Sequence, residues 1–242
     1  MNGTAKRFAY VGPFLLLAAG MTGTARAELI TNGGFETGTF AGWTVANQAG
    51  GSGNWFIQTG TTSPVNGLPV PAPPQGTHAA MTDQGGPGSS VLLQSFTVTP
   101  GSKVTLSFDV YVNNLTGFFS PASLDFTTIP NQQARVDILT AGATPFALGS
   151  SVLDNVFDPL ANTTGYVPES FDITSAVGGG GTFQLRFAEV DNLLNFNLGV
   201  DAVSIVATSA TIPEPDSLIL LATGVIGLAS WRWRCRRPLR GR

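Results

Sequence analysis

Hydrophobic and polar residues alternate along several stretches of the chain, most clearly in KVTLSFDVYV, residues 103–112. Every even position from Val104 to Val112 is apolar, whereas the odd positions carry Lys, Thr, Ser, Asp and Tyr side chains. A period of two is typical of a β-strand that buries one face. The pattern therefore predicts a half-buried strand over these residues.

Weaker alternation recurs in four other stretches, and clusters of Asn, Gly, Pro and Ser separate them. They are SVLLQSFTV from Ser90, QARVDILTA from Gln133, TFQLRFAEV from Thr182 and LGVDAVSIVA from Leu198. No segment before the C-terminal tail shows the 3.6-residue period of an amphipathic helix. The sequence predicts an all-β domain over residues 28–210, an antiparallel β-sandwich whose strands are joined by turns and loops.

The N-terminus has the layout of an export signal. Lys6 and Arg7 precede a short apolar run, 8–19, and Ala25 and Ala27 offer small residues at the two positions that signal peptidase needs. We expect a signal helix within residues 1–27 and cleavage after Ala27. The alternative, an amphipathic helix of the fold, fits less well because the run is apolar on all sides.

A second apolar run lies near the C-terminus. The segment from Ser217 to Trp233 contains about 17 residues, roughly 25 Å of helix, which is just enough to span a bilayer. Trp231 and Trp233 stand where aromatic belts occur, and the arginines that follow should remain cytoplasmic. We expect a single transmembrane helix with the body outside the cytosol; a buried core helix with a basic end is the alternative.

Charge is distributed very unevenly along the chain. The net charge is −3, but between Glu28 and Ile212 three basic residues face thirteen acidic ones. This acidic body argues against a nucleic-acid partner, because such binding needs a basic surface. The single cysteine, Cys235, lies in the tail, so the exported body has neither a disulfide nor a thiol nucleophile.

The C-terminal segment resembles the PEP-CTERM sorting signal of Gram-negative bacteria. Pro213, Glu214 and Pro215 are followed by the apolar run and the arginine cluster, in the order that this family has them. The resemblance implies that residues 211–242 are a sorting signal and that an exosortase cuts near the motif, after which the protein is released or re-anchored at the cell surface. The two prolines also keep the backbone extended, as a processing enzyme requires.

The body resembles the galactose-binding-like jelly roll of carbohydrate-binding modules. The resemblance rests on NGGFETGTFAGWT from Asn32, GTHAAMTD from Gly76, the stretch from Leu92 to Val112, and LGVDAVSIV from Leu198, which look like its successive strands. It implies a structural calcium held by Glu36 and Asp201, with backbone carbonyls near residues 37–39 and Met81. Alternatively, Glu36 lies in a Gly-rich turn and Asp201 is a hydrogen-bonded edge residue.

Catalytic motifs are missing from the sequence of the body. His78 is its only histidine, and the nucleophile-elbow, zincin and Walker motifs do not occur. We expect a non-catalytic domain, although the scattered acids leave a carboxylate pair of the glycosidase type as an alternative.

Aromatic side chains supply the candidates for sugar stacking, since rings pack on the apolar faces of sugars. We select Trp55, Tyr111, Phe118 and Phe119. Trp55 is equally compatible with a core position, and Phe118 and Phe119 with a cover over the sandwich edge. The sequence thus favours binding of a carbohydrate such as an exopolysaccharide; a structural or adhesive surface protein without sugar specificity is the alternative, ahead of a secreted glycan-active enzyme.

Overall fold

The computed structural model describes residues 25–209, 224–226 and 232. Residues 25–209 form one compact unit whose regular elements are almost all strands. Its strands are β1 (Arg26–Glu28), β2 (Thr44–Asn47), β3 (Gly53–Gln58), β4 (Ala79–Gln84), β5 (Gly88–Val98), β6 (Lys103–Asn114), β7 (Gln133–Thr140), β8 (Val152–Phe157), β9 (Val167–Asp172), β10 (Gly181–Asp191) and β11 (Phe196–Thr208). One 3₁₀ turn, η1 (Gly149–Ser151), and one short helix, α1 (Thr174–Val177), complete it.

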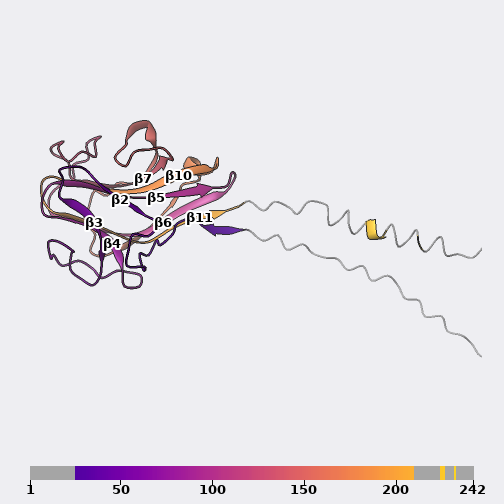
Figure 1. Ribbon diagram of the computed structural model, residues 1–242, viewed down its shortest axis with the longest axis horizontal. Helices are drawn as coiled ribbons and strands as arrows, with labels where there is room; N and C mark the ends of the chain where they lie inside the picture. Colours follow the sequence, from indigo (N-terminus) through magenta and orange to yellow (C-terminus); the bar gives the residue numbers. More distant parts are fainter. Residues whose placement is uncertain (1–24, 210–223, 227–231, 233–242) are drawn as a thin grey trace, which may run out of the picture. The chain divides into compact units, whose positions relative to one another are not determined.

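The strands form two antiparallel sheets, which lie one above the other in Figure 1. The first has the order β3-β4-β11-β6-β9, with β1 paired to β11; the second has the order β2-β5-β10-β7-β8. The five stretches with alternating sequence became β5, β6, β7, β10 and β11, the long strands at the centre of the sheets. The predicted antiparallel sandwich is confirmed.

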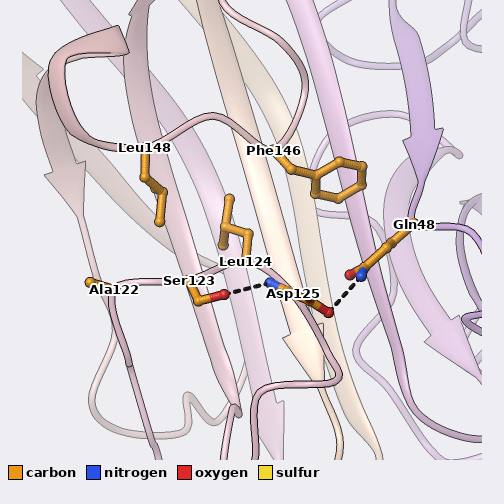
Figure 2. Close-up of a pocket in the computed structure, with 7 residues that line it drawn as sticks. All are labelled: Gln48, Ala122, Ser123, Leu124, Asp125, Phe146 and Leu148. Atoms are coloured by element: carbon orange, nitrogen blue, oxygen red, sulfur yellow. Dashed lines mark hydrogen bonds between the residues drawn. The ribbon is translucent and has the colours of Figure 1, made fainter.

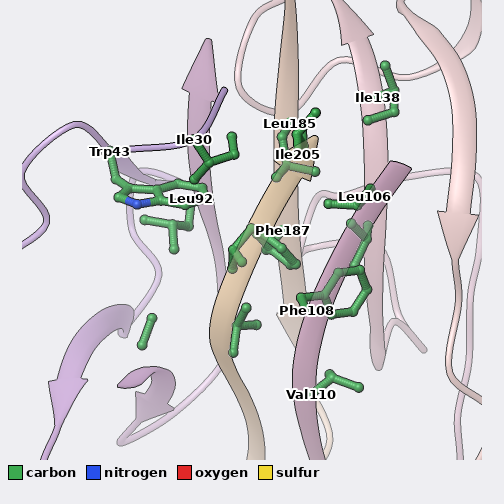
Figure 3. Packing of buried hydrophobic residues seen from close by; sticks show 14 of the residues in the cluster. Ile30, Trp43, Leu92, Leu106, Phe108, Val110, Ile138, Leu185, Phe187 and Ile205 are labelled. Carbon is green, nitrogen blue, oxygen red and sulfur yellow. The ribbon is translucent and has the colours of Figure 1, made fainter. Parts of the chain in front are cut away.

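Apolar side chains from the facing surfaces of both sheets form the core. The even positions of β6 from Val104 to Val112 are all buried in it, as the alternation predicts. Phe187 of β10 is central: its ring lies 5.3 Å from that of Phe108, edge to face, and 6.1 Å from that of Trp43. Figure 3 shows Phe187 with Trp43 and Leu92 on one side of it and Phe108 on the other.

One expected strand is absent from the described body. The phrase NGGFETGTFAGWT, residues 32–44, forms a series of turns, and only its last residue belongs to β2. The reason is local, because Asn32 and Phe35 have φ angles of 53° and 56°, outside the extended region. These turns place Phe35 and Trp43 side by side in the core, with ring centroids 5.6 Å apart.

The two ends of the chain fall largely outside the described residues. The expected signal helix and the motif Pro213-Glu214-Pro215 lie outside them, as does most of the apolar run before the arginines. In the described part, no helix combines the length and apolar character needed to cross a bilayer. Ala25 and Ala27 are described: Ala27 pairs with Ala207, and the Ala25 carbonyl accepts a hydrogen bond from the Ser209 amide at 3.1 Å.

Candidate functional site

The outer face of the five-stranded sheet carries a second apolar cluster. In β10, Leu185 and Phe187 face the core, so the alternate residues Ala188 and Val190 face outward. They join outward residues of β5 and β7 and are covered by two loop segments, residues 122–126 and 143–148. Leu124 is the buried anchor of the first segment, and Phe146 and Leu148 pack down from the second.

A pocket of about 420 Å³ opens between these two loop segments and the end of β2. Its lining consists of Gln48, Ala122, Ser123, Leu124, Asp125, Phe146 and Leu148. Figure 2 shows the aromatic ring of Phe146 on one side, and the amide of Gln48 and the carboxylate of Asp125 facing each other on another. The pocket therefore combines an apolar floor, a half-buried ring and a polar wall.

The polar wall is fixed by hydrogen bonds between segments distant in sequence. Asp125 accepts hydrogen bonds from Gln48 Nε2 at 2.6 Å and from both the amide and the hydroxyl of Thr127 at 2.8 Å. Gln48 Oε1 in turn accepts from the Phe126 amide at 3.1 Å. The hydrogen bond from Gln48, followed by those from Thr127, lowers the pKa of Asp125, so its carboxylate is a charged acceptor at neutral pH.

A buried guanidinium fixes the loop that carries Phe146. Arg186 is fully buried, and its Nη1 donates to the carbonyls of Pro145 at 2.9 Å and Ala147 at 2.7 Å. Its Nη2 lies 2.6 Å from the buried carboxylate of Asp137, which also binds Arg135 at 2.6 Å. Both neighbours of Phe146 are thus tied to the sheet through Arg186, which holds the backbone that carries the ring in place.

The structure corrects two of the four predicted stacking residues. Trp55, only 2% exposed, is part of the core. Tyr111 does lie on the outer face of its sheet, but Tyr166 and Val70, in the loop between β3 and β4, cover it and leave 6% exposed. Neither ring is available to stack on a sugar.

The other two predicted rings lie away from the pocket. Phe118 is half-buried and packs edge to face on the buried Phe196, with ring centroids 5.8 Å apart, so it covers the sandwich edge. Phe119 is exposed and is not among the pocket residues. Sequence reasoning missed Phe146, Gln48 and Asp125, because Gln48 and Asp125 are 77 positions apart and neither stands in a recognisable motif.

The two predicted calcium ligands meet at one short segment, residues 75–78. Glu36 Oε1 accepts hydrogen bonds from the amides of Thr77 and His78, both at 2.9 Å, and Asp201 Oδ2 accepts from the Gln75 amide at 3.1 Å. Glycine is favoured at position 76, since its φ is 64° and a Cβ there would also lie 2.3 Å from the Glu36 carboxylate. Met81, by contrast, lies inside the sheet, paired with Phe56 and Gly199.

Negative charge accumulates around Asp201. It stands directly opposite Asp109 across the β6–β11 pair, so both carboxylates share one face of the sheet. Burial is the main cause that raises the pKa of Asp201 to about 6, and the charges of Asp109 and Glu36 add to it. Among the described residues, no group of three or more His, Cys, Asp or Glu side chains is arranged to hold a metal ion.

Comparison with known proteins identifies structural neighbours at low sequence identity. The chain is similar to the carbohydrate-binding module TmCBM61 in complex with β-1,4-galactotriose, with 14% identity, a TM-score of 0.45, and coverage of 74% of this chain and 97% of that one. It is also similar to the K3 cleaved adhesin domain of Lys-gingipain from Porphyromonas gingivalis W83, with 15% identity, a TM-score of 0.46, and coverage of 76% and 100%.

A third neighbour is the Stig cyclase Fisc from Fischerella sp. TAU, with 18% identity, a TM-score of 0.46, and coverage of 77% of this chain and 100% of that one. No curated protein matches the sequence. Residues 211–237 match the family model of the PEP-CTERM protein-sorting motif, and this C-terminal signal indicates export and sorting in Gram-negative bacteria.

Proposed function

We propose that this chain is an exosortase-sorted, exported protein of the cell surface or extracellular matrix, whose non-catalytic sandwich binds carbohydrate at the pocket beside Phe146. The sorting part is supported by the motif match over residues 211–237, which includes Pro213, Glu214 and Pro215. In this proposal signal peptidase and an exosortase are partners during export, and the C-terminal segment holds the protein in the inner membrane until it is processed.

The observation that carries the binding proposal is the composition of the pocket wall. A sugar ring presents apolar C–H groups on its faces and hydroxyl groups around its rim. Phe146 provides an aromatic surface for the first, and Asp125 and Gln48 provide acceptors and donors for the second. Few polar groups fixed on an otherwise apolar surface are typical of small-molecule sites.

The first test is retention on a panel of soluble polysaccharides, measured by affinity electrophoresis of the full-length chain at millimolar calcium. We expect retention by at least one polysaccharide and a loss of about tenfold or more in affinity for Phe146→Ala, because removing the ring removes the stacking surface. Phe119→Ala is the matched control, since this exposed ring lies outside the pocket. Equal effects of both substitutions would place the sugar elsewhere.

An adhesive function without sugar specificity is the second candidate, and a specific surface favours it. Leu115, Phe119, Ile129, Leu193 and Leu194 are exposed. They lie on neighbouring loops that two hydrogen bonds connect. The Leu115 amide donates to the Asn195 carbonyl at 3.1 Å, and the Leu193 amide donates to Gln132 Oε1 at 3.1 Å. Exposed apolar groups of this kind mark protein contacts. Failure of every polysaccharide to retain the chain would leave this candidate ahead.

We further propose that a calcium ion binds between Glu36 and Asp201. Asp109 and Asp201 stand directly opposite each other, and their carboxylates repel unless a cation lies nearby. Two oxygens also gather next to Gly34: Gln75 Oε1 lies 3.0 Å, and Asp201 Oδ1 3.8 Å, from the place that a Cβ on Gly34 would take. Oxygen donors of this kind suit calcium. A bound ion would link the turns that follow β1 with strand β11. Sequence reasoning did not include Asp109 or Gln75.

Calcium is therefore expected to raise the melting temperature of the sandwich by about 5–10 °C when its concentration is a hundred times the Kd. The measurement is calorimetric melting of the full-length chain in millimolar calcium and in excess chelator. Asp201→Asn should remove most of the difference, whereas Asp172→Asn, on the edge strand β9, should leave it intact. Identical melting in calcium and in chelator would eliminate this site.

A further inference from the structure

The inward-facing side chains change from apolar to acidic at one end of the sandwich. On β10, Leu185 and Phe187 belong to the core, and the next two positions on the same face are Glu189 and Asp191. On β4, Ala80 belongs to the core and Gln84 lies on its face. These three polar residues are 1%, 3% and 0% exposed, so they are removed from solvent almost as completely as the core.

Each of these three side chains carries a buried oxygen that no donor satisfies. Within the part of the chain that the structure describes, Glu189 Oε1, Asp191 Oδ1 and Gln84 Oε1 have no hydrogen-bond partner. The orientation of the Gln84 amide is fixed, because its Nε2 donates to the Phe196 carbonyl at 2.8 Å. Its oxygen must therefore remain an acceptor, and a buried acceptor without a partner is unfavourable.

The two acids also lack a counter-charge. None of the ion pairs of the described residues involves Glu189 or Asp191. The nearby Asp83 makes the environment still more negative, while its own carboxylate is occupied by the amides of Val65 and Asn66 at 2.6 and 2.9 Å. Burial raises the pKa of Asp191 to about 7, although hydrogen bonding from the Gln84 side chain and the Gly88 backbone acts in the opposite direction, and burial raises the pKa of Glu189 well above its usual range. Two charged carboxylates here need a cation beside them.

A small opening leads to this cluster from outside. The turns between β4 and β5 and between β10 and β11 enclose a cavity of about 110 Å³. Its lining consists of Gly86, Pro87, Asp191, Asn192, Leu193, Leu194 and Asn195. Asp191 thus connects the buried cluster to a space large enough for an ion with a few waters.

We propose that Glu189, Asp191 and Gln84 form a second cation site, which holds a divalent ion of the calcium class at this end of the sandwich. Two carboxylates and an amide oxygen are hard donors, the set that such ions prefer over nitrogen and sulfur ligands. The site lies between the two sheets and uses none of the residues around Glu36 and Asp201, so neither site depends on the other or on sugar binding. A bound ion would fasten β4 to β10, which belong to different sheets.

Terbium luminescence provides a specific test, because Tb³⁺ replaces Ca²⁺ and is sensitised by a nearby tryptophan. Across the β3–β4 pair, Trp55 stands opposite Thr82 and Gly53 stands opposite Gln84. Trp55 is therefore the diagonal neighbour of Gln84 on the same face of the sheet, with about 7–8 Å between the two residues. The full-length chain is titrated with Tb³⁺ under tryptophan excitation, then with competing Ca²⁺. Equilibrium dialysis counts the bound Ca²⁺ in parallel.

We expect sensitised emission that Ca²⁺ displaces, and the component of it that is lost in Trp55→Phe, without loss of bound Ca²⁺, reports this site. Asp191→Asn and Glu189→Gln should each remove this Trp55-dependent emission and weaken Ca²⁺ at this site at least tenfold, whereas Glu36→Gln should leave the Trp55-dependent emission unchanged. Far-UV circular dichroism confirms that the variants fold; the two isosteric substitutions are independent, so one folded variant suffices. Trp55-dependent emission that is absent from the unmodified chain, or that survives both substitutions, would overturn the proposal in favour of an uncharged carboxyl pair.

Discussion

Replacing Asp137 with alanine is expected to destabilise the sandwich by about 3–5 kcal/mol, which lowers the melting temperature by roughly 6–20 °C. Asp137 is fully buried, and its two oxygens accept hydrogen bonds from Arg186, Arg135 and Asn155. Without it, the guanidinium of Arg186 stays buried with only the carbonyls of Pro145 and Ala147 as partners. An uncompensated buried charge is the reason for the large effect. Urea unfolding measures it.

Two controls separate charge burial from a general effect of substitution on this sheet. Asp154→Ala, on the edge strand β8, should change the free energy of unfolding by about 0.5 kcal/mol or less, because this carboxylate makes no hydrogen bond or ion pair among the described residues. Combining Asp137→Leu with Arg186→Met should recover part of the loss. A single Asp137→Ala effect no larger than that of Asp154→Ala would contradict the role of the buried pair.

Replacing Phe187 with alanine is expected to destabilise the fold by a similar amount, about 3–5 kcal/mol. Its side chain is completely buried and contacts the ring of Phe108 on the facing sheet and the ring of Trp43 just before β2. The substitution therefore leaves a cavity at the point where both sheets and the turns before β2 meet. Thermal unfolding followed by near-ultraviolet circular dichroism reports both the stability and the packing of Trp43.

The matched comparison for Phe187 is Phe119→Ala, which removes the same side chain from a position that is 41% exposed. We expect a change of about 0.5 kcal/mol or less there. Phe187→Leu should recover part of the loss, because a smaller cavity remains. If the two alanine variants unfolded at the same temperature, the core around Phe187 would not have the central position described above.

The central strands could be predicted from sequence because each has one face in the core. In β6 the apolar residues recur at every second position from Val104 to Val112, and this period does not depend on the conformation of the connecting loops. The edge strands gave no such signal: β8 and β9 are short and half-exposed, and β9 contains Pro168 next to its first residue. A proline is tolerated there because an edge strand has one unpaired side.

The pocket beside Phe146 could not be predicted, since alternation assigns a side chain to a face but does not say what covers that face. Tyr111 was correctly assigned to the outer face, yet the loop containing Val70 buries it. Phe146 gave no signal, because its position depends on Arg186, 40 positions further along the chain. Glu36 and Asp201 were identified only through the resemblance to a known fold, and the structure brings both to residues 75–78.

Protection from hydrogen exchange, measured by mass spectrometry on the full-length chain with and without a retaining polysaccharide, tests the binding site most directly. We expect slower exchange in peptides covering Gln48, residues 122–126 and residues 143–148, the three segments that surround the pocket. Protection in those peptides should disappear in Phe146→Ala. Protection confined to the loops that carry Leu115, Ile129 and Leu194, with none around Phe146, would contradict this binding site.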